Sequence, residues 1–135
     1  MLAVARKQGG GPFMTKEIAE QQHLPPTYLE QLMVQLRKAG LLTATRGAHG
    51  GYLLARPAAD ITLLEIIEAL EGPLTLVECP GGAGGCCGEP ESCALAAIWE
   101  RASQTLRNTF QAVTLAHLVE DQQTRESSVA LMFNI

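Results

Sequence analysis

The sequence lacks any apolar run that approaches the roughly 20 residues needed for a membrane-spanning helix. Its first residues, MLAVARKQGG, also lack the basic start and long apolar core of a secretory signal and the Arg-rich pattern of a transit peptide. No internal repeat is recognisable. These absences exclude a chain with membrane helices and predict a soluble, cytoplasmic protein. The apolar fraction of 47% in 135 residues excludes a disordered chain and suffices for one domain core.

No set of residues suited to catalysis can be assembled from the spacings. The three histidines are scattered at positions 23, 49 and 117, and no nucleophile, base and oxyanion-binding group accompany them. We therefore expect that the protein is not an enzyme.

The net charge of −4 is unevenly distributed along the chain. Residues 1–60 contain seven basic and four acidic side chains, a net charge of +3. Residues 61–135 contain three basic and ten acidic side chains, a net charge of −7. A basic half joined to an acidic half predicts an anion-binding module followed by a separate sensing or assembly module.

The basic half has the pattern of two short helices followed by a β-hairpin. Thr15 is expected to cap the first helix, and Pro26 suits the first position of the second, which Gly40 ends. In the second helix Leu29, Leu32, Met33 and Leu36 form one apolar stripe. In LLTATRGAHGGYLLARP two strand-like runs flank a basic, glycine-rich tip. This order predicts a winged helix-turn-helix DNA-binding domain over residues 1–60.

The acidic half begins with a complete helix-start signature. Thr62 is expected as the N-cap, Glu65 reaches back to it, Ile61 packs on Ile66, and Gly72 with Pro73 ends the helix. After a cysteine-rich segment, apolar and small residues recur at alternating steps of four and three, the spacing of a helix-pairing seam. These residues are Leu95, Trp99, Ala102, Leu106, Thr109, Val113 and Ala116.

This seam predicts a long helix that joins two chains into a homodimer, although the same stripe is also suited to the chain's own core. A break near Thr114 is expected to start a last short turn, and DQQTRESS is predicted to be a polar tail. The predicted fold is therefore mainly α with a small β-hairpin wing. The predicted second region, residues 61–135, contains a sensing loop at about residues 78–93 and the dimerisation helix.

The exposed face of the second short helix carries side chains that can read DNA. Gln pairs with adenine, Glu accepts from cytosine, and Thr or Tyr serves a base or a phosphate, which favours Thr27, Tyr28, Glu30 and Gln31. At the hairpin tip, Arg46 and His49 are expected to reach the backbone or the minor groove. Plainer interpretations stay open: Tyr28 covers the small core, Glu30 solvates the helix, and His49 is a turn residue.

The segment ECPGGAGGCCGEPESC, residues 78–93, contains all four cysteines of the chain. In a reducing cytosol such a cluster indicates metal binding, redox chemistry or catalysis more than a disulfide framework. Thiolates bind iron–sulfur clusters and zinc alike, and the paired C-x-x-C knuckles typical of structural zinc sites do not occur.

The order of motifs resembles the Rrf-type family of bacterial winged helix-turn-helix transcription regulators, which includes IscR, NsrR and CymR. The likeness rests on TYLEQLMVQLRKAGLL, RGAHGGYLLARP, ITLLEIIEALEG, the cysteine segment and CALAAIWERA, and covers essentially the whole chain. It implies a homodimer on a near-palindromic operator. Thr27, Tyr28, Glu30 and Gln31 match the family's DNA-reading positions, Arg37 lies on the same helix, and Arg46 begins the wing. Family members begin about a dozen residues earlier, so the chain is expected to lack that stretch.

The resemblance also implies a ligand set for an iron–sulfur cluster, [2Fe–2S] rather than [4Fe–4S]. Family members with a cluster use three cysteines about five residues apart, which favours Cys79, Cys87 and Cys93, with Cys86 as the alternative to Cys87. A histidine that follows the last cysteine in IscR-like relatives is replaced here by Ala96.

The function predicted from these observations is a DNA-binding repressor that senses iron–sulfur, redox or nitric-oxide status. One alternative is a cluster-free regulator that, like CymR, responds through its thiols or a protein partner such as an enzyme of cysteine metabolism. Zinc binding and a vestigial loop also stay open. A small iron–sulfur electron-transfer protein would explain the cysteines but leaves the basic hairpin without a role.

Overall fold

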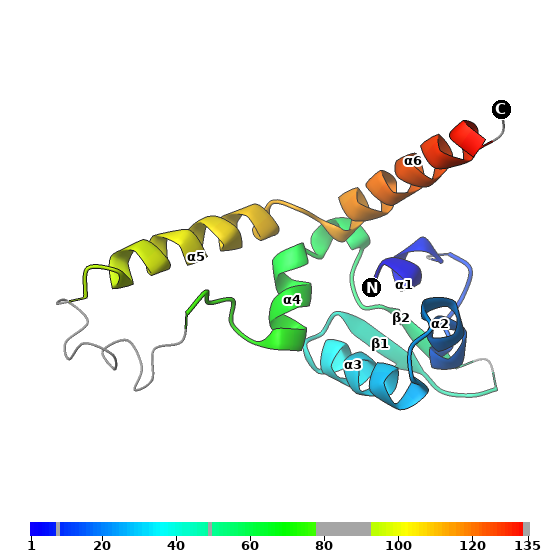
Figure 1. Cartoon of the computed structure of the whole chain (residues 1–135). Helices are drawn as coiled ribbons and strands as arrows, with labels where there is room; N and C mark the ends of the chain where they lie inside the picture. The colour runs from blue at the N-terminus through cyan, green and yellow to red at the C-terminus, as the bar shows by residue number, and fades with distance from the viewer. Residues whose placement is uncertain (8, 49, 78–92, 134–135) are drawn as a thin grey trace.

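The computed structural model describes residues 1–7, 9–48, 50–77 and 93–133. Its elements are α1 (Leu2–Arg6), α2 (Thr15–Gln22), α3 (Pro26–Lys38), β1 (Leu42–Thr45), β2 (Gly51–Leu54), the 3-10 turn η1 (Ala58–Asp60), α4 (Leu63–Glu71), α5 (Ala96–Gln111) and α6 (Leu115–Phe133). Figure 1 shows α1–α4 and the hairpin gathered into one unit, here called the head, above which α5 and α6 run in opposite directions. The predicted fold class, mainly α with a two-stranded wing, is confirmed.

Helices α2 and α3 form the expected helix-turn-helix. His23 ends α2 in the left-handed conformation with φ of 52°, and its N–H bonds back to the last turn of α2. Pro26 occupies the first turn of α3, as predicted, because a proline there removes only an N–H that has no helical partner. The predicted cap at Thr15 is wrong: Thr15 is already helical, and Met14 precedes it without a side-chain cap.

The hairpin forms as expected and gains a third backbone partner. Strands β1 and β2 pair antiparallel, with Leu42 opposite Leu54 and Thr45 opposite Gly51. Phe13, from the segment before α2, forms a bridge with Tyr52 through N–H···O bonds of 2.9 and 2.8 Å. The Phe13 side chain is buried, so the start of the helix-turn-helix is fixed to the wing on the side opposite β1.

Helix α4 begins with the capping box predicted from the sequence. The Glu65 N–H donates to the Thr62 hydroxyl at 3.2 Å, and the Thr62 N–H donates to the Glu65 carboxylate at 2.8 Å. Ile61 and Ile66 both enter the core, and the helix ends at Glu71 before Gly72, whose φ is 86°.

The break near Thr114 is confirmed, but the elements after it differ from expectation. In place of a short turn and a polar tail, residues 115–133 form the helix α6, in which the predicted tail DQQTRESS is helical and exposed. Thr114 lies in an isolated bridge with Thr62: Leu63 donates to the Val113 carbonyl and Leu115 to the Ile61 carbonyl, both at 2.8 Å. The α5–α6 junction is thereby attached to the start of α4.

One hydrophobic core underlies α1–α4, the hairpin and the start of α6. Its buried members include the α3 stripe residues Leu29, Met33 and Leu36, with Leu32 partly buried beside them. Leu115, which the sequence pattern did not single out, is fully buried. None of the helices in the described ranges is long and apolar enough to span a membrane. The domain boundary at residue 60 stays a prediction.

Candidate nucleic-acid interface and sensing region

Helix α3 separates an apolar face from a polar one. Its stripe packs into the core, which holds the helix in place, whereas Thr27, Tyr28, Glu30, Gln31 and Arg37 are all exposed. The residue Tyr28 is 51% exposed, which disagrees with the interpretation that it covers the small core. A helix fixed on one side by Leu and Met and presenting hydroxyl, amide, carboxylate and guanidinium groups on the other is suited to contact base edges and phosphates.

The wing tip lies on the same side of the head as α3. Figure 1 shows both on the side away from α5 and α6. Arg46 directly follows β1 and is exposed, and Gly47 turns the chain with φ of 119°, a conformation that favours glycine. His49, the other residue predicted to contact DNA from the wing, lies outside the described residues. The structure therefore brings α3 and the hairpin, whose first strand Arg46 directly follows, to one side of the head.

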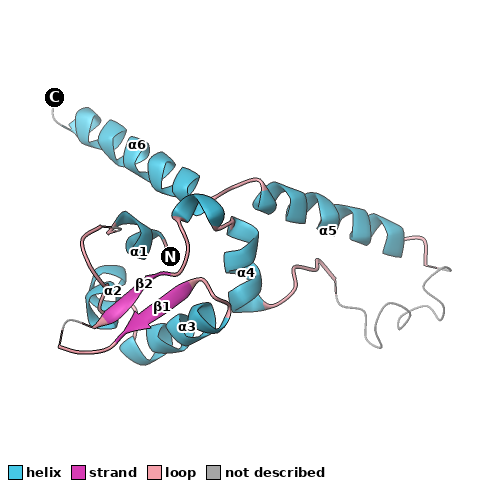
Figure 2. Ribbon diagram, turned by 180° about the vertical axis from the view of Figure 1, so that it is seen from behind, coloured by secondary structure: helices cyan, strands magenta, loops and turns pink. Residues whose placement is uncertain are grey.

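Exposed apolar side chains lie at the N-cap and in the first turn of helix α5. Leu95, Ile98 and Trp99 are 57%, 50% and 42% exposed, whereas Ser103, further along α5, is buried. Figure 2 shows α5 extending away from the head, and it contacts the head chiefly through α4. Leu95 and Trp99, the first two residues of the predicted stripe, therefore contact water and do not pack on the chain's own core.

Of the predicted metal ligands, only Cys93 belongs to the described residues. It is half-buried three residues before the first residue of α5, Ala96, whose N–H donates to the Cys93 carbonyl at 3.1 Å. Cys79, Cys86 and Cys87 lie outside the described residues. Within the ranges that the structure describes, no three His, Cys, Asp or Glu side chains are grouped closely enough to hold a metal ion. A thiolate donor set is chemically suited to an iron–sulfur cluster.

Helix α4 carries two acidic residues that connect different parts of the molecule. Glu65 pairs with Arg56, which follows the wing, at 2.8 Å, and Arg56 also donates to the Asp60 carbonyl at 3.1 Å. The Thr62 backbone N–H, and then Arg56 and the Thr62 hydroxyl, hold the pKa of Glu65 below its usual value. The carboxylate thus stays ionised where it caps α4 and holds the chain after the wing.

Glu68, one helical turn further on, contacts both α5 and the segment that leads toward the cysteines. Its Oε1 accepts from Arg107 Nη1 at 2.6 Å and from the Leu74 N–H at 3.3 Å. Two residues later, the Leu76 N–H donates to the hydroxyl of buried Ser103 at 3.2 Å. Sequence reasoning missed the Glu68–Arg107 and Leu76–Ser103 contacts, since 39 and 27 residues separate the partners and no local pattern marks them.

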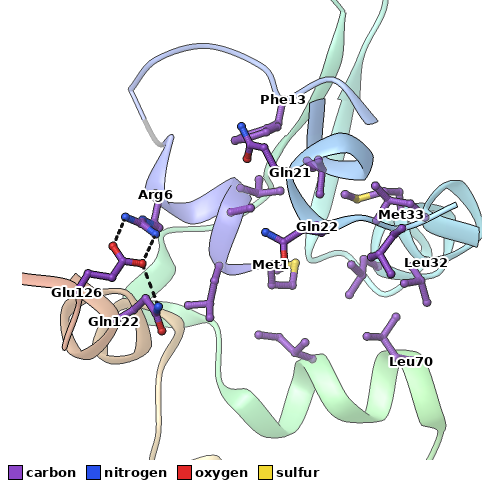
Figure 3. Close-up of a pocket in the computed structure, with 18 residues that line it drawn as sticks. Met1, Arg6, Phe13, Gln21, Gln22, Leu32, Met33, Leu70, Gln122 and Glu126 are labelled. Carbon is purple, nitrogen blue, oxygen red and sulfur yellow. Dashed lines mark hydrogen bonds and ion pairs between the residues drawn. The ribbon is translucent and has the colours of Figure 1, made fainter. Parts of the chain in front are cut away.

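A cavity of about 680 Å³ lies between α1, α2, α3, α4 and α6 (Figure 3). Most of its lining is apolar, with Leu32, Met33 and Leu70 among the residues on its walls. At its rim Arg6 donates two hydrogen bonds, of 3.0 and 2.7 Å, to Glu126 of α6. Gln122 and Arg6 lower the pKa of Glu126. The cavity shows no set of groups suited to catalysis among its lining residues.

Comparison with known proteins gives consistent matches over most of the chain. Residues 1–121 match the family Rrf2, described as an iron-dependent transcriptional regulator. The chain is 38% identical to the HTH-type transcriptional regulator IscR of Escherichia coli O1:K1 / APEC over 128 residues, which cover 95% of this chain and 78% of that protein.

Two solved structures show the same architecture. CymR, the global cysteine regulator of B. subtilis, is 36% identical with a TM-score of 0.72, covering 88% of this chain and 86% of that one. IscR of T. potens is 36% identical with a TM-score of 0.71, covering 90% and 78% of the two chains.

Proposed function

The chain belongs to the Rrf2 family of transcriptional regulators, and we propose that it is a cytoplasmic repressor that binds double-stranded DNA as a homodimer. The observation that carries this proposal is the exposed polar face of α3, a helix that lies on the same side of the head as the wing hairpin. Arg46 directly follows β1 of that hairpin and is exposed. In this arrangement α3 enters the major groove while the wing contacts the flanking backbone or minor groove.

Each exposed residue has a role that its chemistry supports. Gln31 and Glu30 read base edges by hydrogen bonds, and Thr27 and Tyr28, in the first turn of α3, contact a base or a phosphate. Arg37, Arg46 and His49 neutralise phosphates or enter a narrow minor groove. The net charge of −7 on residues 61–135 would repel DNA, so these residues face away from it.

The homodimer is supported by the exposed apolar side chains of α5. Leu95, Ile98 and Trp99 form a surface that a second copy of the helix would remove from water. Pairing of two α5 helices places two heads side by side, which suits the two half-sites of a near-palindromic operator.

The sensing role is proposed for the cysteines. Cys79, Cys87 and Cys93, with Cys86 as the alternative to Cys87, would hold a [2Fe–2S] cluster, which supplies iron–thiolate bonds that oxidants and nitric oxide disrupt. This part of the proposal rests on the thiolate donors and on the position of Cys93 at the start of the dimerisation helix. A cluster-free alternative, in which the thiols or an enzyme of cysteine metabolism carry the signal, is favoured by the similarity to CymR.

DNA binding is tested by selecting duplexes from a random-sequence library with the full chain. We expect a near-palindromic sequence, bound in gel shifts with strong salt dependence. Gln31→Ala should lose about 5–150-fold in affinity for that duplex, corresponding to about 1–3 kcal/mol for one base contact, and relax specificity at one position. Gln123→Ala, at an exposed position of α6, is the matched control. If Gln31→Ala and Gln123→Ala bind the selected duplex with equal affinity, α3 does not read the DNA sequence.

The sensing role requires a separate measurement. Anaerobically purified protein should contain iron and sulfide and absorb visible light, and its affinity for the selected duplex should change when the iron is chelated. A colourless, iron-free dimer with unchanged DNA affinity would favour the cluster-free alternative. A protein that contains iron and sulfide but selects no duplex would instead favour the electron-transfer class.

A further inference from the structure

Helix α4 holds α5 at two points rather than one. At its start, the Thr62–Thr114 bridge fixes the α5–α6 junction through two backbone hydrogen bonds of 2.8 Å. Six residues further along α4, Glu68 binds Arg107 of α5 at 2.6 Å. With a rise of 1.5 Å per residue, the two points are about 9 Å apart along α4. The bridge therefore acts as a pivot, and the Glu68–Arg107 pair sets the angle between α4 and α5.

The second point of attachment also holds the segment that leads toward the cysteines. The Oε1 atom of Glu68 that accepts from Arg107 also accepts from the Leu74 N–H, and Leu76 is held by Ser103 of α5. Residues 72–77 are here called the stem. Through Leu74, the stem is bound to the same Glu68 carboxylate oxygen that binds Arg107. A displacement of the stem changes the hydrogen bonding of the same atom that fixes α5.

The contact is placed where a small change has a large effect. A movement of about 1 Å at Glu68, on a lever of about 9 Å, rotates α5 by about 6°. Along the 16 residues of α5, about 24 Å, this rotation displaces the far end by about 2.5 Å. Successive base pairs of DNA are about 3.4 Å apart, so the displacement approaches the spacing of one base pair. The head side of α4 is fixed separately by Glu65 and Arg56.

We propose that Glu68 and Arg107 form an angle-setting lock between the head and the dimerisation helix, and that the stem acts on this lock through Leu74. The inference rests on the proposed function, because the angle matters when two heads must fit two half-sites. Glu68 and Arg107 are positioning residues: they act on DNA only through the separation of the two reading helices, which they set.

The first test needs no DNA. Amide hydrogen exchange of the full chain is followed by mass spectrometry in Glu68→Ala and in Glu71→Ala, a matched control at the exposed end of the same helix. Because Glu68→Ala removes the acceptor of Leu74, exchange in the stem should rise about threefold to tenfold. Exchange at the start of α4 should stay unchanged, because the Thr62–Glu65 capping box is intact. If amide exchange in the stem is unchanged in Glu68→Ala, or rises equally in Glu68→Ala and Glu71→Ala, the proposed lock is overturned.

The second test measures the spacing of the heads. The probe is the duplex selected by the wild-type protein, with the distance between half-sites lengthened or shortened by one base pair. Wild type should lose about tenfold or more in affinity, whereas Glu68→Ala and Arg107→Ala should lose less than about threefold, because the released angle adapts. Arg101→Ala, an exposed position on α5, is the control for Arg107→Ala. If Glu68→Ala and Arg107→Ala both discriminate between half-site spacings as strongly as the wild type, the inference is overturned while the DNA-binding function stands.

Two further variants separate the lock from a general loss of structure. Arg107→Lys keeps a cation opposite Glu68 and should restore most of the wild-type spacing discrimination. Ser103→Ala releases Leu76 alone, so it should raise stem exchange without changing spacing discrimination, and a change in discrimination would count against the lock. If the wild-type protein selects no duplex, the proposed function fails, and the exchange experiment then decides the lock.

Discussion

Gly51 offers the sharpest test of how the wing is built. Its α-carbon faces the backbone of Phe13, and an added Cβ would lie 2.5 Å from the Phe13 carbonyl oxygen and 2.8 Å from the carbonyl carbon. Both atoms belong to the backbone, so no side-chain rotation relieves the overlap. The same carbonyl accepts from the Tyr52 N–H at 2.8 Å. Gly51→Ala must therefore move the Phe13 strand away from β2.

The size of the effect follows from these contacts. The Phe13 backbone has to retreat by about 1 Å to reach ordinary van der Waals separation from the new methyl group. Overpacking of this kind costs about 1–3 kcal/mol, and weakening the two Phe13–Tyr52 hydrogen bonds adds to it. We expect a loss of about 2–3 kcal/mol in the free energy of unfolding. For a chain of this length, that lowers the melting temperature by about 6–15 °C.

The measurement is thermal and urea unfolding followed by circular dichroism, together with gel shifts on the selected duplex. Ala44→Val is the control, because it adds methyl groups at an exposed position of β1 opposite Tyr52 and should change stability by about 0.5 kcal/mol or less. DNA affinity of Gly51→Ala should fall below the wild-type value even at temperatures where the protein stays folded. A melting temperature within about 2 °C of wild type would refute the packing of Phe13 against the wing.

Three other predictions follow from residues outside the wing. The pKa of Glu65 is lowered in the folded state. The ionised Glu65 carboxylate therefore stabilises the fold fully above about pH 4.5, and this stabilisation is lost as the pH falls through the folded pKa. Between pH 5 and 3, the free energy of unfolding should fall less in Glu65→Gln than in the wild type. Trp99→Asp should weaken dimerisation by about 30-fold or more in sedimentation equilibrium, whereas an unchanged dimer would show that α5 is not the interface. Arg37→Ala should lower the slope of log affinity against log salt by about 1, which Arg125→Ala on α6 should not do.

The elements that were predictable from the sequence are those specified by neighbouring residues. The α3 stripe repeats at the helical period, the capping box spans four residues, and the hairpin tip is marked by glycines on both sides. In each case the partners of the interaction lie within about a dozen residues of each other in the sequence. A single segment therefore contains enough information to specify its own conformation.

The features that could not be predicted depend on distant partners. DQQTRESS has no apolar stripe of its own, yet it lies within α6, whose first residue, Leu115, is fully buried and whose Glu126 pairs with Arg6. The Phe13–Tyr52 bridge and the Glu68–Arg107 pair each join residues 39 positions apart. Glu68 and Arg107 look solvent-exposed in the sequence, and only the fold reveals that they pair with each other.

For the candidate DNA-contacting site, the sequence predicted which face of α3 is exposed. The α3 stripe fixed which side of the helix is covered, so Thr27, Tyr28, Glu30 and Gln31 followed by exclusion, and all four are exposed. Their roles in DNA reading stay predictions. The predicted helix-pairing seam also followed from the spacing of its residues, but α5 ends at Gln111, so Val113 and Ala116 of that seam lie outside this helix.

The Thr62–Thr114 bridge has a consequence for the order of folding. Its backbone partners, Ile61 with Leu115 and Leu63 with Val113, come from segments about 50 residues apart, so the bridge closes a long loop and is costly to form early. The helix-turn-helix and hairpin contain mainly local contacts and emerge first during synthesis. We expect the DNA-reading half to gain its structure before α5 has a fixed direction, so that subunit association is the last event in the maturation of the protein.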